Sequence, residues 1–140
     1  MATNVLTLAR NAITAVVAVD ATMHTLCGRS TGCIVAWATI AAARIPVVAL
    51  TVSSIEIDGI DNPHEVLALF TAQAEGARGV EVAEALAQRV RELVGETQVL
   101  GAGIQLAPID VSQQPIDDAD LVPPGRSRVD LTIRFRAEVL

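Results

Sequence analysis

The end of the chain, RSRVDLTIRFRAEVL (126–140), alternates apolar and polar side chains almost without exception. The apolar positions are Val129, Leu131, Ile133, Phe135, Ala137 and Val139. A period of two residues is typical of a β-strand with one buried face, because successive side chains of a strand point to opposite sides of its sheet. The segment therefore predicts a strand in a sheet whose apolar face is covered by other elements.

The polar face of this strand is basic, although the chain as a whole is acidic. Arg126, Arg128, Arg134 and Arg136 supply four of its ten basic residues, whereas the net charge is −6. An acidic chain lacks the basic footprint of a nucleic-acid binder, so we expect no specific nucleic-acid binding. The arginine face must therefore meet either solvent or an acidic protein surface.

The first part of the chain predicts helices and one short strand. Apolar residues recur at helical spacing over residues 4–19, which Thr3 or Asn4 can cap. Asp20 is a candidate cap for a short helical continuation that ends at Gly28. Residues 33–37 then predict a short strand, followed by a connector.

The rest of the chain predicts a long hairpin, a helix and two more strands. Residues 45–58 and 64–75 form the arms of the hairpin around a Gly/Asn/Pro turn, and its first arm begins with an apolar run typical of burial on both faces. A helix follows over 79–94, and then a strand over 103–114 that Pro108 makes an edge or bulged strand. The expected fold is one α+β domain over residues 1–140: a mainly antiparallel β-sheet with a long hairpin and two helices packed on one face.

No group of residues forms a recognisable catalytic or cofactor site. The GAG sequence at 101–103 lacks the third glycine and the strand–helix context of a dinucleotide fingerprint, and GRSTG at 28–32 lacks the lysine of a phosphate loop. His24 and Cys27 share a short helix, a spacing that also arises without catalysis. We therefore expect no enzyme activity and no cofactor.

A metal site and a membrane span are not expected either. Cys27 and Cys33 have no His/Cys pair to complete a zinc site, and we interpret them as buried thiols. Asp58, Asp61 and Asn62 lack the glycine and distal glutamate of a calcium loop. The longest uncharged run, residues 30–43, is shorter than the roughly 20 residues of a membrane helix, and no signal peptide is evident.

The order of elements and three short phrases resemble a known family. The phrases are RIPVVAL (44–50), VAEALAQRVRELV (82–94) and LTIRFRA (131–137). Over about residues 4–138 the chain resembles the tail terminator, or tail completion, proteins of long-tailed bacteriophages and phage-like particles. The chain departs from the family in its few aromatic residues and its long acidic loop at 115–125.

The resemblance implies a structural role rather than a chemical one. It implies a hexameric ring in the neck of a virion, assembled in the host cytoplasm, that caps the tail tube, stops its polymerisation and offers a surface to the head-side connector. No catalytic residues carry over. Two alternatives stay open: a head-closure or connector protein of the neck, and a small ligand-binding regulatory domain. The regulatory domain would form its pocket between the hairpin and the second helix, with the GAG turn at the mouth.

A ring also suggests a partner for the arginine face. Neighbours in a ring meet through two different surfaces, so the basic strand of one copy can meet an acidic segment of the next. We predict a subunit boundary that includes Arg128, Arg134 and Arg136, with Asp117, Asp118 or Asp120 of the adjacent copy as partners. The competing interpretation is a basic sheet face that contacts only solvent.

Overall fold

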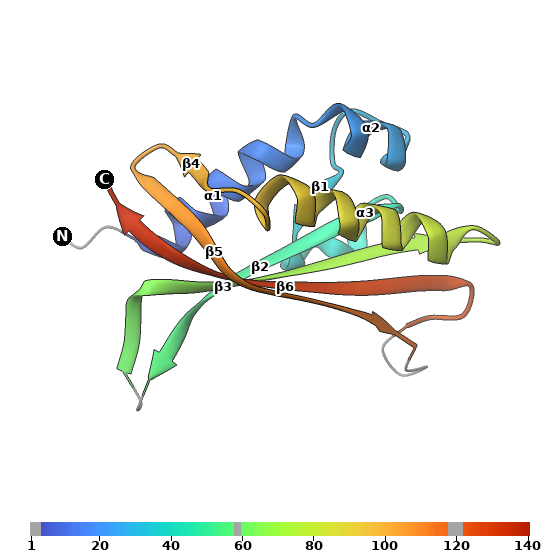
Figure 1. Ribbon diagram of the computed structural model, residues 1–140. Helices are drawn as coiled ribbons and strands as arrows, with labels where there is room; N and C mark the ends of the chain where they lie inside the picture. Colours follow the sequence, from blue (N-terminus) through green and yellow to red (C-terminus); the bar gives the residue numbers. More distant parts are fainter. Residues whose placement is uncertain (1–3, 58–59, 118–121) are drawn as a thin grey trace.

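The protein is built around one mixed sheet, which Figure 1 shows from the side. The computed structural model describes residues 4–57, 60–117 and 122–140, with only the backbone for residues 41–42, 55–57 and 60–64. The strand order is β1-β2-β3-β6-β5-β4. The strands are β1 (Ile34–Ala36), β2 (Val47–Ile57), β3 (Ile60–Glu75), β4 (Val99–Gly101), β5 (Ile104–Ile116) and β6 (Arg126–Val139). Neighbouring strands are antiparallel except β1 and β2, which confirms the predicted mainly antiparallel α+β fold.

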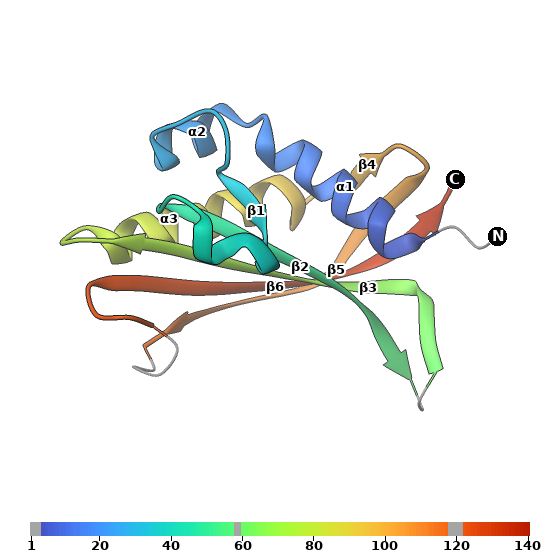
Figure 2. The same cartoon turned by 180° about the vertical axis from the view of Figure 1, so that it is seen from behind.

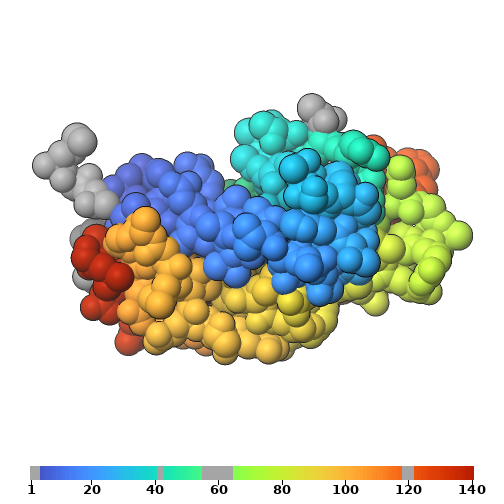
Figure 3. All heavy atoms as spheres, turned by 90° about the horizontal axis from the view of Figure 1, so that it is seen from above, coloured from blue at the N-terminus to red at the C-terminus, as the bar shows by residue number. Residues whose placement is uncertain are grey.

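The α-helices of the described residues lie on one face of the sheet, as Figures 1 and 2 show from opposite sides. They are α1 (Val5–Ala18), α2 (Ala21–Cys27) and α3 (Gly79–Val94). The sequence predicted two helices, the first with a short continuation. That continuation is a separate helix, because the axis bends by 76° between α1 and α2. Seen from above, α1 and α2 form a ridge beside α3 and hide most of the sheet (Figure 3).

The core lies between these helices and the sheet. The alternation of β6 places Val129, Leu131, Ile133, Phe135 and Ala137 on the covered face, each at most 4% exposed. Val139 is 46% exposed, so the apolar face ends one step earlier than its sequence predicted. The first arm of the hairpin is buried on both faces from Val47 to Leu50, as its apolar run predicted.

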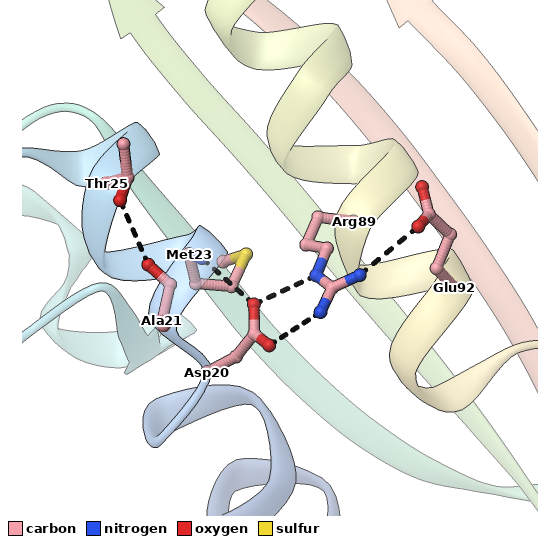
Figure 4. Close-up of polar contacts among 6 residues, drawn as sticks. All are labelled: Asp20, Ala21, Met23, Thr25, Arg89 and Glu92. Atoms are coloured by element: carbon pink, nitrogen blue, oxygen red, sulfur yellow. Dashed lines mark hydrogen bonds and ion pairs between the residues drawn. The ribbon is translucent and has the colours of Figure 1, made fainter.

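A partly buried ion pair joins the two helical segments of the covered face (Figure 4). Asp20 caps α2 by accepting from the Met23 backbone N–H at 2.9 Å. The same carboxylate accepts from Arg89 of α3 at 2.9 Å and 2.7 Å, and Arg89 also donates to Glu92 at 3.2 Å. The guanidinium of Arg89 lowers the pKa of the Asp20 carboxyl. The predicted cap therefore also fixes α2 against α3.

The β2–β3 hairpin extends beyond the sheet. Its strands pair from Val47–Gln73 outward to Ile57–Ile60, with a register shift between Ser54 and Ile55. Residues 63–65 have no partner on β2 because of this shift, and one of them is Pro63, which lacks an N–H to donate. The return arm begins at Ile60, which pairs with Ile57, and thus earlier than the predicted His64.

The other end of the sheet contains a strand that the sequence analysis missed. The short strand β4 pairs with the start of β5, and the GAG residues connect them. A side chain at Gly101 would collide with Ala12 of α1, so the glycine permits close packing of α1 on β4. The register of β5 shifts between Pro108 and Asp110, and among the described strands β5 pairs only with β6 beyond Leu106. This confirms Pro108 as a feature of a bulged edge strand.

The segment after β1 is a 3-10 helix, η1 (Trp37–Ala42), where the sequence predicted only a connector. It contacts β1 and β2 at the edge of the sheet. Its first residue, Trp37, is 43% exposed.

Candidate assembly surface

The candidate surface is the sheet face opposite the helices, called here the open face. Pairing places β6 between β3 and β5, so its polar side chains run along the middle of this face. Arg128 lies opposite Gln73 and Ile116, and Arg134 lies opposite Leu67 and Asp110. The three predicted interface arginines, Arg128, Arg134 and Arg136, therefore share one face, as the alternation required.

At one end of the open face, Arg128 has its partners within the chain. Its Nε and Nη2 donate to the two carboxylate oxygens of Asp130 at 2.8 Å and 3.0 Å. The two side chains are only 13% and 17% exposed. The guanidinium also lies over the Trp37 ring, 5.6 Å from its centroid. Arg128 is thus largely satisfied before any second copy approaches.

The sequence analysis missed both of these partners. Asp130 follows Arg128 by two residues and therefore shares its strand face, so the spacing alone contained the signal. Trp37 lies far away in the sequence, and only the tertiary structure brings it to the strand. Beside them, Val47, Ala49 and Thr71 of the open face are buried at 0%, 1% and 0% exposure. In the part of the chain that the structure describes, the Thr71 hydroxyl has no hydrogen-bond partner.

At the other end of the open face, Arg134 and Arg136 lack such partners. Arg134 lines a shallow depression of about 230 Å³ with Leu67, Asp110 and two other residues of the sheet. Its Nε is buried and finds no acceptor among the described residues. Among the side chains that the structure describes, no carboxylate lies within ion-pair distance of Arg134 or Arg136.

Only one of the predicted acidic partners lies within the described residues. Asp117 follows the end of β5, is exposed, and lines a depression of about 400 Å³ with Arg126, Arg128 and the start of α3. Asp118 and Asp120 lie outside the described residues. Within one copy, Asp117 therefore lies near the end of the open face that contains Arg128, and far from Arg134 and Arg136.

The thiols and histidine that suggested a nucleophile are occupied in packing. Burial, together with the neighbouring Cys33 thiol, raises the pKa of Cys27 to about 12. Its thiol is therefore protonated at neutral pH, which makes it a poor nucleophile. His24 donates from Nε2 to the Ala18 carbonyl at 2.7 Å, so this nitrogen is not available to activate Cys27. Both cysteines are free and buried, as expected.

The regulatory alternative placed a pocket between the hairpin and the second helix. Within the sheet, β3 of the hairpin packs directly against α3, and the outer part of the hairpin turns to the opposite side of the sheet (Figure 1). Among the described residues, no group of three His, Cys, Asp or Glu side chains is arranged to hold a metal ion. Within the same part of the chain, no single helix is long and apolar enough to cross a membrane; α1 and α2 meet that test only jointly, as a bent pair.

Comparisons with known proteins give one informative result. No protein-family model matches the chain, and no curated protein sequence matches it. A solved structure described as the virion of a native gene transfer agent (GTA) particle contains a chain with a similar fold. The TM-score is 0.61 at 17% sequence identity, and the match covers 98% of this chain and 99% of that one.

Proposed function

We propose that this protein is a structural component of a phage-like virion. The observation that carries the proposal is the fold match to a chain of a gene transfer agent virion over nearly the full length of both chains. At 17% identity the likeness concerns the fold, and the function is our inference from it. The match agrees with the resemblance of the sequence to tail terminator proteins of bacteriophages and phage-like particles.

Within the virion, the proposed role is that of a tail terminator. Copies form a ring, with six subunits as the resemblance implies, that caps the tail tube, ends its polymerisation and presents a joining surface to the head-side connector. The role is non-enzymatic and needs no cofactor. The protonated Cys27 thiol and the hydrogen-bonded His24 support this, because neither is poised for catalysis.

The proposed subunit boundary includes the arginine end of the open face. Among the described residues, Arg134 has a buried Nε without an acceptor and Arg136 is exposed, whereas Arg128 is already paired with Asp130. Arg128 therefore takes part in the proposed boundary as part of a packed surface with Trp37, and not as a free charge. Asp117, Asp118 and Asp120 of an adjacent copy remain candidate partners from the sequence.

Deletion of the gene in a particle-producing host tests the proposal. Without the protein, we expect tails of irregular and often excessive length that fail to join heads, measured by electron microscopy. Restoring the gene on a plasmid should restore uniform tails. Tails of normal length that remain headless would instead support the head-closure or connector role. Normal complete particles would contradict any role in the virion.

A further inference from the structure

The outer part of the β2–β3 hairpin lacks the support that the rest of the sheet has. The pairing of β3 with β6 ends at Glu65 and Arg136, so beyond this point β3 pairs only with β2. A two-stranded hairpin is marginally stable in water without a third strand or a packed helix. In Figures 1 and 2 this part turns out of the plane of the sheet, toward the side of the open face and away from all helices.

The charge of this segment is complementary to the unsatisfied end of the open face. Beyond Glu65, which lies opposite Arg136 of its own chain, residues 55–64 contain three carboxylates, those of Glu56, Asp58 and Asp61, and no arginine. Arg134 and Arg136 lie on the open face with a buried, unpaired Nε on Arg134. Leu67 and Leu69 are half-buried on the same face, so a partner there would also cover apolar surface.

Within its own chain, the hairpin meets the arginines of β6 only at its base, where Glu65 lies opposite Arg136. The hairpin leaves the sheet beside Arg136 of its own chain. Its outer part then projects outward on the side of the open face and does not fold back over the strands of its own sheet (Figure 1). Its own arginines thus lie at its base and not under its outer part. A contact of hairpin on open face uses two different surfaces of one chain, which is the heterologous geometry that closes rings.

We infer that the acidic β2–β3 hairpin of one copy docks on the open face of the next copy, where it pairs with Arg134 and Arg136. This refines the proposed boundary by replacing the loop at 117–120 with the hairpin as the acidic partner. It rests on the proposed function only in requiring that copies assemble in the particle. Charge-assisted pairs with an unsatisfied guanidinium give such a contact its register.

Disulfide trapping in assembled particles tests the inference. The double variant Asp61→Cys/Arg134→Cys replaces the native protein in a particle-producing host, and purified particles are oxidised mildly and analysed on a non-reducing gel. We expect a ladder of covalent oligomers that collapses to monomer on reduction. The native Cys27 and Cys33 are 5% and 2% exposed and should not contribute, which the unmodified protein checks.

Two matched pairs identify the partner. Asp61→Cys/Arg10→Cys, with Arg10 exposed on α1, should stay monomeric on the gel. Asp117→Cys/Arg134→Cys represents the rival contact through the loop. A ladder from the loop pair alone, or no ladder from any pair in complete particles, would overturn the inference. The first of these results leaves a terminator ring intact, and tail length in the deletion host tests that role separately.

Charge exchange covers the case in which the cysteine pair blocks particle formation. Arg134→Glu should reduce the yield of complete particles, and adding Asp61→Arg should recover part of the loss. A double variant as defective as the worse single variant would overturn the inference.

Discussion

The two ends of the open face contain the same residue type in the same strand, but only one end is completed within the chain. Arg128 has a bidentate carboxylate and the Trp37 ring, and the surface beside it is buried. Arg134 has a buried Nε without an acceptor and a shallow depression beside it. The difference teaches that a basic strand face can serve folding at one end and remain available for a partner at the other.

The largest effect on folding stability is expected at the end of the open face where Arg128 pairs with Asp130. Asp130→Ala leaves the nearly buried Arg128 without its carboxylate and should lower the free energy of unfolding by about 1.5–3 kcal/mol. Urea denaturation of the purified protein measures this. Replacing both partners, Arg128→Gln with Asp130→Asn, should cost less than the sum of the single changes, because no unpaired charge stays behind. An unchanged midpoint for Asp130→Ala would show that the pair adds nothing to stability.

A smaller loss is expected from the aromatic partner of Arg128. Trp37→Ala removes the cation–π contact and should lower the free energy of unfolding by about 0.5–2 kcal/mol. Trp37→Phe, which keeps an aromatic ring, is the matched control and should retain part of the effect. Because this is the sole tryptophan, unfolding must be followed by circular dichroism. Equal losses in both variants would show that an aromatic ring as such contributes nothing at this position.

The buried Thr71 hydroxyl gives a prediction of the opposite sign. Its oxygen has no partner at 0% exposure, so Thr71→Val should stabilise the protein by about 0.5–1 kcal/mol by removing an unsatisfied polar group. The same change at the half-exposed Thr132 should be close to neutral, because solvent reaches that hydroxyl. Thermal or urea unfolding of the two variants compares them. A destabilised Thr71→Val would mean that the hydroxyl does have an acceptor.

The smallest free energy per contact is expected at the end of the open face with Arg134 and Arg136, and it affects assembly rather than folding. Arg134→Glu should weaken oligomerisation or tube capping by about 0.2–1 kcal/mol for each pair lost, repeated around a ring. The defect should be larger at low salt than at high salt, because ions already screen the native pair at high ionic strength. Arg10→Glu makes the same charge change on α1 and should assemble normally. Normal assembly of Arg134→Glu at low salt would show that this end contacts only solvent.

Much of the fold could be predicted from local patterns. The structure confirms the alternation of β6, the apolar run of β2 and the caps at Asn4 and Asp20. These features were predictable because each depends on residues that are close together in the sequence. The short strand β4 and the helix η1 were not predictable in this way. The equally short β1 lies in the apolar run at 33–37, whereas β4 has only Val99 and Leu100 between a polar segment and a glycine, which is too little pattern to identify a strand. Both β4 and η1 depend on the neighbours against which they pack.

The sequence by itself determined which residues face the core and which arginines share one strand face, because side-chain alternation is a local property of an extended backbone. Only the tertiary structure decided how those arginines differ. It brings Trp37 to Arg128 from a distant segment and ends the pairing of β6 with β3 at Arg136, where the hairpin leaves the sheet. The physical reason is that ion pairing and burial depend on through-space neighbours, which the order of residues along one strand does not specify.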